Sequence, residues 1–240
     1  MSFKIPGKIK KIIKPLAKAV ASAMVWILLL IHYYVFRRNK NYLPVLFVNL
    51  CLNDLLVFKI DPKKIKYHTG DPDKLSDNLF VWSGGWDRKI IVIEEHEKFN
   101  MIRELIVEKR KYEELQFYSY AIKQIKMGKP VSRGNQMLDS KEKIMQYFKK
   151  QERLFEEIRS RGFNLELAPE IGVAVSREGG LIHYRQGHHT LAMAKILGVK
   201  NVRVRTRAVH RLWLLENIKG DGLFLLKSLR RGINKLYKQA

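Results

Sequence analysis

The residues with the clearest chemical potential lie in a short run where an expected strand meets glycine and then an expected helix. This run contains Arg185, Gly187, His188, His189 and Thr190. Glycine permits a sharp turn, and the free N–H groups and positive dipole end at a helix start attract phosphate. The spacing therefore predicts an anion-binding turn with these five as ligand-binding residues, although an ordinary strand–turn–helix would account for the same residues.

Several histidines close to this run raise the question of a metal site. His183, His188, His189 and His210 match no zinc-binding spacing, and a strand followed by a helix is expected to point their rings in different directions. We therefore predict no dedicated metal ligands. Mg²⁺ carried in with a phosphorylated ligand is more compatible with the sequence, with Asp87 as the protein ligand.

Three arginines follow the expected helix at alternate positions of an apolar run. Arg203, Arg205 and Arg207 should face one side of a strand over 202–206, and the valines and threonine between them should face the other. This pattern fits a solvated strand face, and it equally fits a groove for the phosphates of a nucleic acid or a lipid headgroup.

Composition indicates a folded chain with anionic partners. The chain has 240 residues, 46% of them hydrophobic, and a net charge of +23. Residues 1–40 contain nine basic residues and no acidic one, and the remainder is still basic, with 37 against 23. The single cysteine, Cys51, excludes an internal disulfide framework and a cysteine zinc site.

Residues 1–40 combine a lysine-rich amphipathic pattern with an apolar run of about 18 residues, the lower limit for crossing a bilayer. A membrane span, an interfacial helix and a soluble packed helix all remain open, whereas a signal peptide lacks a cleavage site after the apolar run. A membrane span with its lysines in the cytoplasm would export the domain that carries the expected anion-binding turn, which favours an in-plane or re-entrant helix. We expect association with an anionic membrane surface at the cytoplasmic face.

The rest of the sequence predicts strands alternating with helices. We expect β-leaning runs at 43–50 and 55–60, a turn at Asp61-Pro62, and a loop over 68–79. Further strands are expected at 90–93, 171–175, 181–184 and 202–206, and helices at 97–125, 140–161, 188–197, from about 210, and 223–237. The last helix has a basic amphipathic pattern.

The run around Gly187 resembles the ParB/sulfiredoxin superfamily in its glycine, its His189, its helix of the form Ala-x-Ala, and the following Leu197-Gly198 and strand. The strand and Asp-Pro turn at 58–65 resemble the N-terminal motif of that family. The resemblance implies binding of nucleotide phosphates by Gly187, His188 and His189, with ATP, ADP or CTP and Mg²⁺ as cofactors. Thr190 stands where the family has arginine, and His188 replaces the catalytic cysteine of sulfiredoxins.

Two further elements resemble motifs of membrane-proximal or phage-borne ParB-like proteins. Gly84 to Asp87 looks like their Gly-x-Trp-Asp element, and His210 to Trp213 looks like their His-x-x-Trp element. Phosphate transfer to a hydroxyl needs a base, for which Asp61 and Asp87 are the nearest acids and Asp87 is preferred. Asp87 and His189 are the expected catalytic residues, with Asp61, Trp86, Arg203, Arg205 and His210 as further candidates. Core packing for Trp86 and a turn or cap for Asp87 are equally open.

These observations predict an α/β (α+β) domain with a small mixed sheet of the ParB/sulfiredoxin type over residues 43–215, interrupted by a helical insertion at 97–162. A hydrophobic, amphipathic helix (1–40) and a basic amphipathic helix (216–240) should flank it. The leading hypothesis is a membrane-associated nucleotide- or phosphate-binding protein, with a small-molecule or headgroup phosphotransferase as its enzymatic form. The alternatives are a non-enzymatic DNA-binding protein of the ParB or phage type, and a structural membrane-surface protein with a relic site.

Overall fold

The computed structural model describes residues 43–70, 77–134, 136–162, 169–219 and 222–239, together with Met24, Ile27 and Ile31. The expectations for the N-terminal segment 1–40 lie outside the described residues, apart from those three, which are helical and exposed. Within the described ranges, no helix combines the length and the apolar character that crossing a membrane requires.

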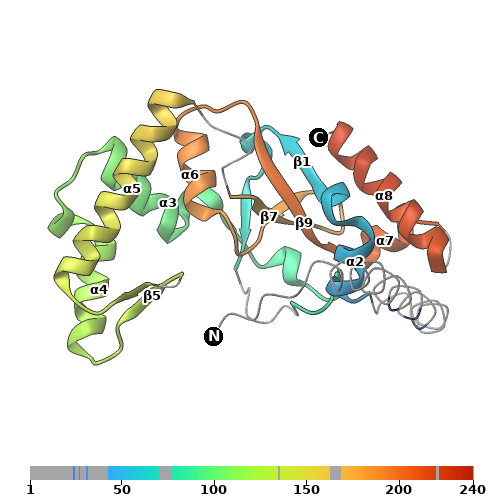
Figure 1. Cartoon of the computed structure of the whole chain (residues 1–240), viewed down its shortest axis with the longest axis horizontal. Coiled ribbons are helices and arrows are strands. Elements are labelled where there is room, and N and C mark those ends of the chain that lie inside the picture. Colours follow the sequence, from blue (N-terminus) through green and yellow to red (C-terminus); the bar gives the residue numbers. More distant parts are fainter. Residues whose placement is uncertain are drawn as a thin grey trace, which may run out of the picture.

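A mixed sheet of seven strands forms the centre of the molecule (Figure 1). The strand order is β1-β9-β7-β8-β2-β4, and β3 pairs in parallel with the end of β9. The pairs β7–β9 and β2–β8 are parallel, whereas β1–β9, β7–β8 and β2–β4 are antiparallel. The strands are β1 (Val57–Ile60), β2 (Tyr67–Thr69), β3 (Val81–Trp82), β4 (Ile90–Val92), β7 (Ile171–Val175), β8 (Leu181–His183) and β9 (Val202–His210). The α/β class predicted from sequence is therefore confirmed.

The two central strands show why the sequence forms this sheet. All five residues of β7 are buried, as expected for an apolar strand covered on both faces. In β9 the side chains of Val202, Val204 and Thr206 are buried, and the arginines between them are partly exposed. The predicted period of two in this strand is confirmed.

Among the described residues, three helices cover the sheet at its β1 and β9 side (Figure 1). They are α2 (Val45–Leu52), α7 (Arg211–Asn217) and α8 (Gly222–Gln239). The predicted C-terminal amphipathic helix is confirmed, and its apolar residues Leu225, Leu229 and Ile233 are buried in the main core. The β-leaning expectation for 43–50 is wrong, because Phe47, Val48 and Leu52 are spaced to bury one face of a helix.

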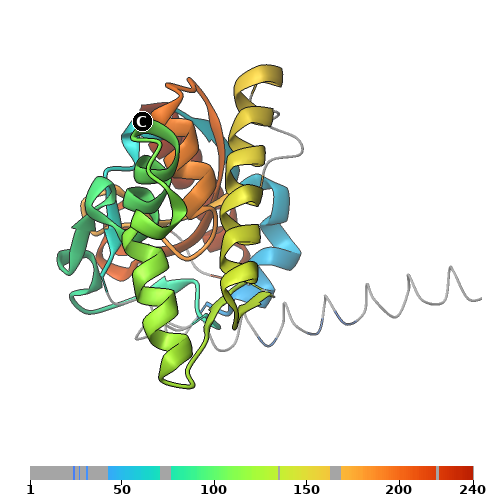
Figure 2. The same cartoon turned by 90° about the vertical axis from the view of Figure 1, so that its left-hand side faces the viewer.

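The predicted helical insertion contains α3 (Glu97–Ile102), α4 (Gln116–Lys126), α5 (Lys141–Arg161) and an unexpected hairpin of β5 (Val131–Arg133) and β6 (Gln136–Leu138). Figure 2 shows α4 and α5 side by side with the hairpin at their shared end. The expectation of one helix over 97–125 is wrong. A π-helical turn over 103–107 and Lys109, with a φ of 51°, interrupt it.

Helix α6 (His188–Ile196) joins the insertion to the sheet (Figure 1). Leu191 and Ala194 belong to the main core with the strands, whereas Ala192 and Met193 pack into a second apolar cluster with residues of α3, α4 and α5. Because α6 is held on both sides, its N-terminus has a fixed position at the boundary between the sheet and the insertion.

Candidate functional site

The turn that leads into α6 has a backbone that only glycine fits. Gly187 has a φ of 82°, and a Cβ added to it would lie 2.9 Å from both Cα and Cγ1 of Ile171 in β7. Arg185, two residues earlier, also has a positive φ, of 58°. Among the described residues no side chain caps the start of α6, so the N–H groups of its first residues are free to bind an anion.

A pocket of about 770 Å³ opens beside this turn. Basic side chains reach it from separate elements: Lys98 from α3, Arg133 from β5, Lys150 from α5, and Arg185 from the turn itself. Its other described lining residues are Gly134, Gln136, Tyr147, Gln151, Leu154, Pro169, Gly187, His188, His189 and Thr190. No carboxylate is among these lining residues, so the local charge favours an anionic ligand.

Two of the basic side chains around the pocket already have partners within the fold. Arg133 donates to Glu97 at 3.0 Å and lies over the ring of Phe117, and Arg185 is paired with Asp77. Lys150 lies exposed on α5. Lys150 is therefore the lining cation that a substitution can probe with the smallest effect on the fold.

His189 lies inside the pocket wall as a neutral side chain. Its Nε2 is 2.8 Å from the hydroxyl of Tyr147 on α5. Burial, followed by the charges of Lys98 and Arg133, lowers the pKa of His189 to about 4. His189 would therefore contact a phosphate through a neutral hydrogen bond rather than through a positive charge.

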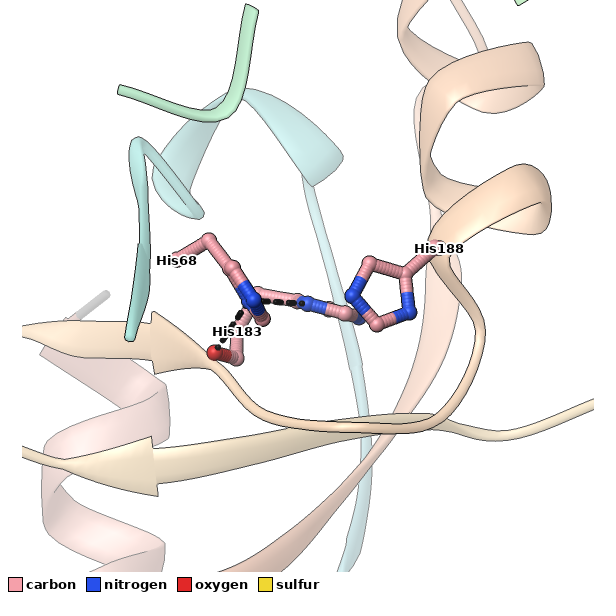
Figure 3. Close-up of side chains that lie close together, drawn as sticks. All are labelled: His68, His183 and His188. Atoms are coloured by element: carbon pink, nitrogen blue, oxygen red, sulfur yellow. Dashed lines mark hydrogen bonds between the residues drawn. The ribbon is translucent and has the colours of Figure 1, made fainter. Parts of the chain in front are cut away.

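The rings of His68, His183 and His188 converge behind the turn (Figure 3). His68 and His183 stand opposite each other in the parallel pair β2–β8, and their Nδ1 atoms are 3.1 Å apart. The ring centroids of His183 and His188 are 4.2 Å apart. For His183 and His188 the expectation of rings that point in different directions is wrong, because the positive φ angles of Arg185 and Gly187 turn the chain back over the end of β8. His189 and His210 do point elsewhere, toward the hydroxyl of Tyr147 and the backbone carbonyl of Gly84.

Sequence reasoning missed His68 as a member of this group. It lies in a stretch expected to be a loop, and only the register of β2 against β8 brings it beside His183. Burial is the main cause that lowers the pKa of His68 to about 4 and that of His183 to about 3. Both imidazoles are therefore neutral at neutral pH.

Asp87 is held away from the α6 turn. Its carboxylate accepts hydrogen bonds from Nε and Nη2 of Arg177 at 2.8 and 2.5 Å, just beyond the C-terminal end of β7. Gly187 contacts Ile171 at the opposite end of β7. The structure does not bring the two expected catalytic residues, Asp87 and His189, together. Burial alone would raise the pKa of Asp87, but the hydrogen bonds of Arg177 and the nearby His210 lower it overall.

Three other candidates have structural contacts. Asp61 accepts a hydrogen bond from the backbone N–H of Lys63 at 2.9 Å and so caps a short 3₁₀ turn. Trp86 is buried edge-to-face against Trp82. His210 accepts from the backbone N–H of Leu212 at 3.0 Å, which caps α7.

The arginine stripe of β9 is largely engaged within the fold. Glu170 accepts hydrogen bonds from Arg203 at 3.0 Å and from Nε of Arg205 at 2.5 Å. Arg205 also donates to the backbone carbonyl of Asn53 at 3.1 Å, and Arg207 to the side chain of Gln186. These contacts leave the stripe less basic than the sequence alone indicates.

Comparison of the chain with protein-family models, with curated proteins and with solved structures gives no match. The site is therefore interpreted from its own geometry. Of the sequence candidates, Arg185, Gly187, His188, His189 and Thr190 come together at one pocket. The remaining candidates, Asp61, Trp86, Asp87, Arg203, Arg205 and His210, are not among its lining residues.

Proposed function

We propose that this protein binds a phosphorylated small molecule, with a nucleotide such as ATP, ADP or CTP as the ligand class, at the N-terminus of α6. The observation that carries the proposal is the pocket at Gly187, where the uncapped start of a helix meets Lys98, Arg133 and Lys150 from three other elements. Free backbone N–H groups and surrounding cations are the combination that phosphate groups need.

The size and charge of the pocket support a small ligand rather than a macromolecule. Its volume of about 770 Å³ is within the range of small-molecule sites, about 300 to 1,000 Å³. Each charge-assisted hydrogen bond to a phosphate oxygen would contribute roughly 1.5 to 3 kcal/mol. Several such bonds from the α6 turn and the lysines would give a ligand with two or three phosphates a clear advantage over its nucleoside.

The proposal includes a ParB/sulfiredoxin-like arrangement of residues 43–215. It is supported by strand β8, Gly187 and α6 in succession, and by the Asp61-Pro62 turn directly after β1. It is limited to binding, because the described lining residues include no carboxylate to act as a base or to hold Mg²⁺. Asp87, expected to fill both roles, is bonded to Arg177 instead.

Association with an anionic membrane surface through residues 1–40 is a separate part of the proposal, supported by their nine basic residues and apolar run. Flotation with vesicles containing anionic lipid should recover the full chain and leave a chain lacking residues 1–40 in the unbound fraction. Equal recovery of both would contradict this part alone.

Calorimetric titration with ATP, ADP, CTP and adenosine tests the binding proposal. We expect saturable binding of at least one nucleotide and much weaker binding of adenosine. Lys150→Glu should weaken nucleotide binding at least about tenfold, which corresponds to about 1.4 kcal/mol of binding free energy. The variant replaces an attractive contact with a phosphate by a repulsive one, and the attractive contact alone would contribute roughly 1.5 to 3 kcal/mol. Lys149→Glu is the matched control, because Lys149 is also exposed on α5 but is not among the described lining residues. Failure of all three nucleotides to bind, or equal losses in the two variants, would overturn the proposal.

A further inference from the structure

The three converging histidines have a geometry that a metal ion could complete. One ring nitrogen from each of His68, His183 and His188 lies within 4.8 Å of the other two. Around a tetrahedral ion with metal–nitrogen bonds of about 2.05 Å, ligand nitrogens are separated by about 3.4 Å. The Nδ1 atoms of His68 and His183, 3.1 Å apart, are already close to that separation.

The tautomer of His183 is set by its other nitrogen. Nε2 of His183 lies 2.8 Å from the carbonyl oxygen of Gln186 and donates its hydrogen there. Nδ1 therefore carries a lone pair directed at His68 (Figure 3). A ligand histidine with its second nitrogen bonded to a backbone carbonyl is the usual arrangement in protein metal sites.

The ion would take the place of a hydrogen that His68 and His183 now share. Nδ1 of His68 is within 3.1 Å of both Nδ1 and the carbonyl oxygen of His183, so one proton can be shared there. Metal binding would need the other neutral tautomer of His68, with its proton on Nε2, so that the Nδ1 lone pairs of both histidines face the ion. Because β2 and β8 are paired in the sheet, the two ligands need little rearrangement.

We propose that His68, His183 and His188 form a binding site for a divalent transition-metal ion of the zinc type, with one coordination position left for a solvent molecule or an anion. Three histidines and an open position are the donor set of catalytic rather than structural zinc sites. His188 also lines the pocket, so the ion would lie next to the phosphate-binding turn. The proposal stands independently of nucleotide binding.

Two neighbours shape this site without joining it. His96 packs against His68 and His188, but its Nδ1 accepts the backbone N–H of Lys98 and caps α3. Lys98 places a positive charge near His188, which opposes a cation and favours an anion at the open position. Replacing Lys98 with methionine should therefore tighten metal binding.

Metal titration of the full, tag-free chain without nucleotide tests the site. After treatment with a chelator, we expect one Zn²⁺ per chain and, with Co²⁺, the intense visible absorption of a tetrahedral complex. His188→Gln should weaken Zn²⁺ binding more than about 100-fold, since changes outside the ligand shell alone cost 10- to 100-fold. His189→Gln, at the next position, should stay within about threefold, because His189 is bonded to Tyr147 instead.

Imidazole nitrogen NMR of the unaltered chain gives a second readout if His188→Gln does not fold. Addition of Zn²⁺ should shift the resonances of His68, His183 and His188 and leave those of His189 and His210 in place. The proposal is overturned by sub-stoichiometric binding, by an octahedral cobalt spectrum, by equal weakening in the two variants, or by shifts at other histidines only.

Discussion

Gly187 lies against Ile171 so closely that a single added methyl group would meet the backbone of β7 at 2.9 Å. The contact fixes where α6 begins relative to the sheet, and so where its free N–H groups point. The phosphate-binding turn and the position of His188 both depend on this one approach.

Gly187→Ala should therefore damage both stability and binding. The left-handed φ of 82° and the contact with Ile171 together should cost about 2 to 4 kcal/mol of unfolding free energy. Gly198→Ala is the control, since Gly198 has a φ of 64° but open space around its Cβ, and should cost only about 1 kcal/mol. Denaturant unfolding measures the unfolding free energy of both variants. Equal losses would show that the contact of Gly187 with Ile171 adds nothing to the cost of the left-handed φ.

Asp87→Asn should reveal a structural ion pair. The variant should lose about 1.5 to 3 kcal/mol of unfolding free energy at pH 7, the range for hydrogen bonds to charged groups. Asp87 has a folded pKa below its ordinary value of 3.8, so the unfolded state binds more protons and the contribution is fully present above that pH. It is lost as pH falls through the folded pKa.

The difference between the native chain and Asp87→Asn should therefore shrink below about pH 4. Asp54→Asn, on the exposed surface, should change stability little at any pH. Nucleotide affinity should be unchanged in Asp87→Asn when the protein is folded. A large loss of nucleotide affinity with normal stability would instead show that Asp87 takes part in nucleotide binding.

Arg205→Gln tests whether the β9 stripe binds DNA. Because Glu170 and Asn53 already hold this guanidinium, the variant should lose about 1.5 to 3 kcal/mol of stability. The salt dependence of duplex binding should not change, and Lys235→Gln on α8 provides the exposed control. A slope of log affinity against log salt that falls by about one for Arg205→Gln would favour the nucleic-acid alternative.

Local patterns in the sequence are sufficient to predict the strands β7, β8 and β9, the start of α6 and the helix α5, since each has clear periodicity and end signals. The turn at Gly187 is also predictable, because a glycine between a strand pattern and a helix pattern marks the point where the backbone reverses. The arginines of β9 lie on one face as their spacing predicts, but spacing could not identify their partner Glu170.

The errors at the candidate site have a common physical origin in long-range pairing. Asp87 is separated from its partner Arg177 by 90 positions, and His68 from His183 by 115. No local pattern reports such contacts. The histidine cluster and the ion pair at the far end of β7 therefore emerge only when the strand order and register are known.

Backbone amide NMR during titration with a nucleotide and with inorganic phosphate tests the central claim most directly. The account predicts that the N–H resonances of His188, His189 and Thr190 shift the most, and that the same shifts in Gly187→Ala require far higher concentrations. Saturable binding accompanied by shifts only at residues outside the pocket would contradict it.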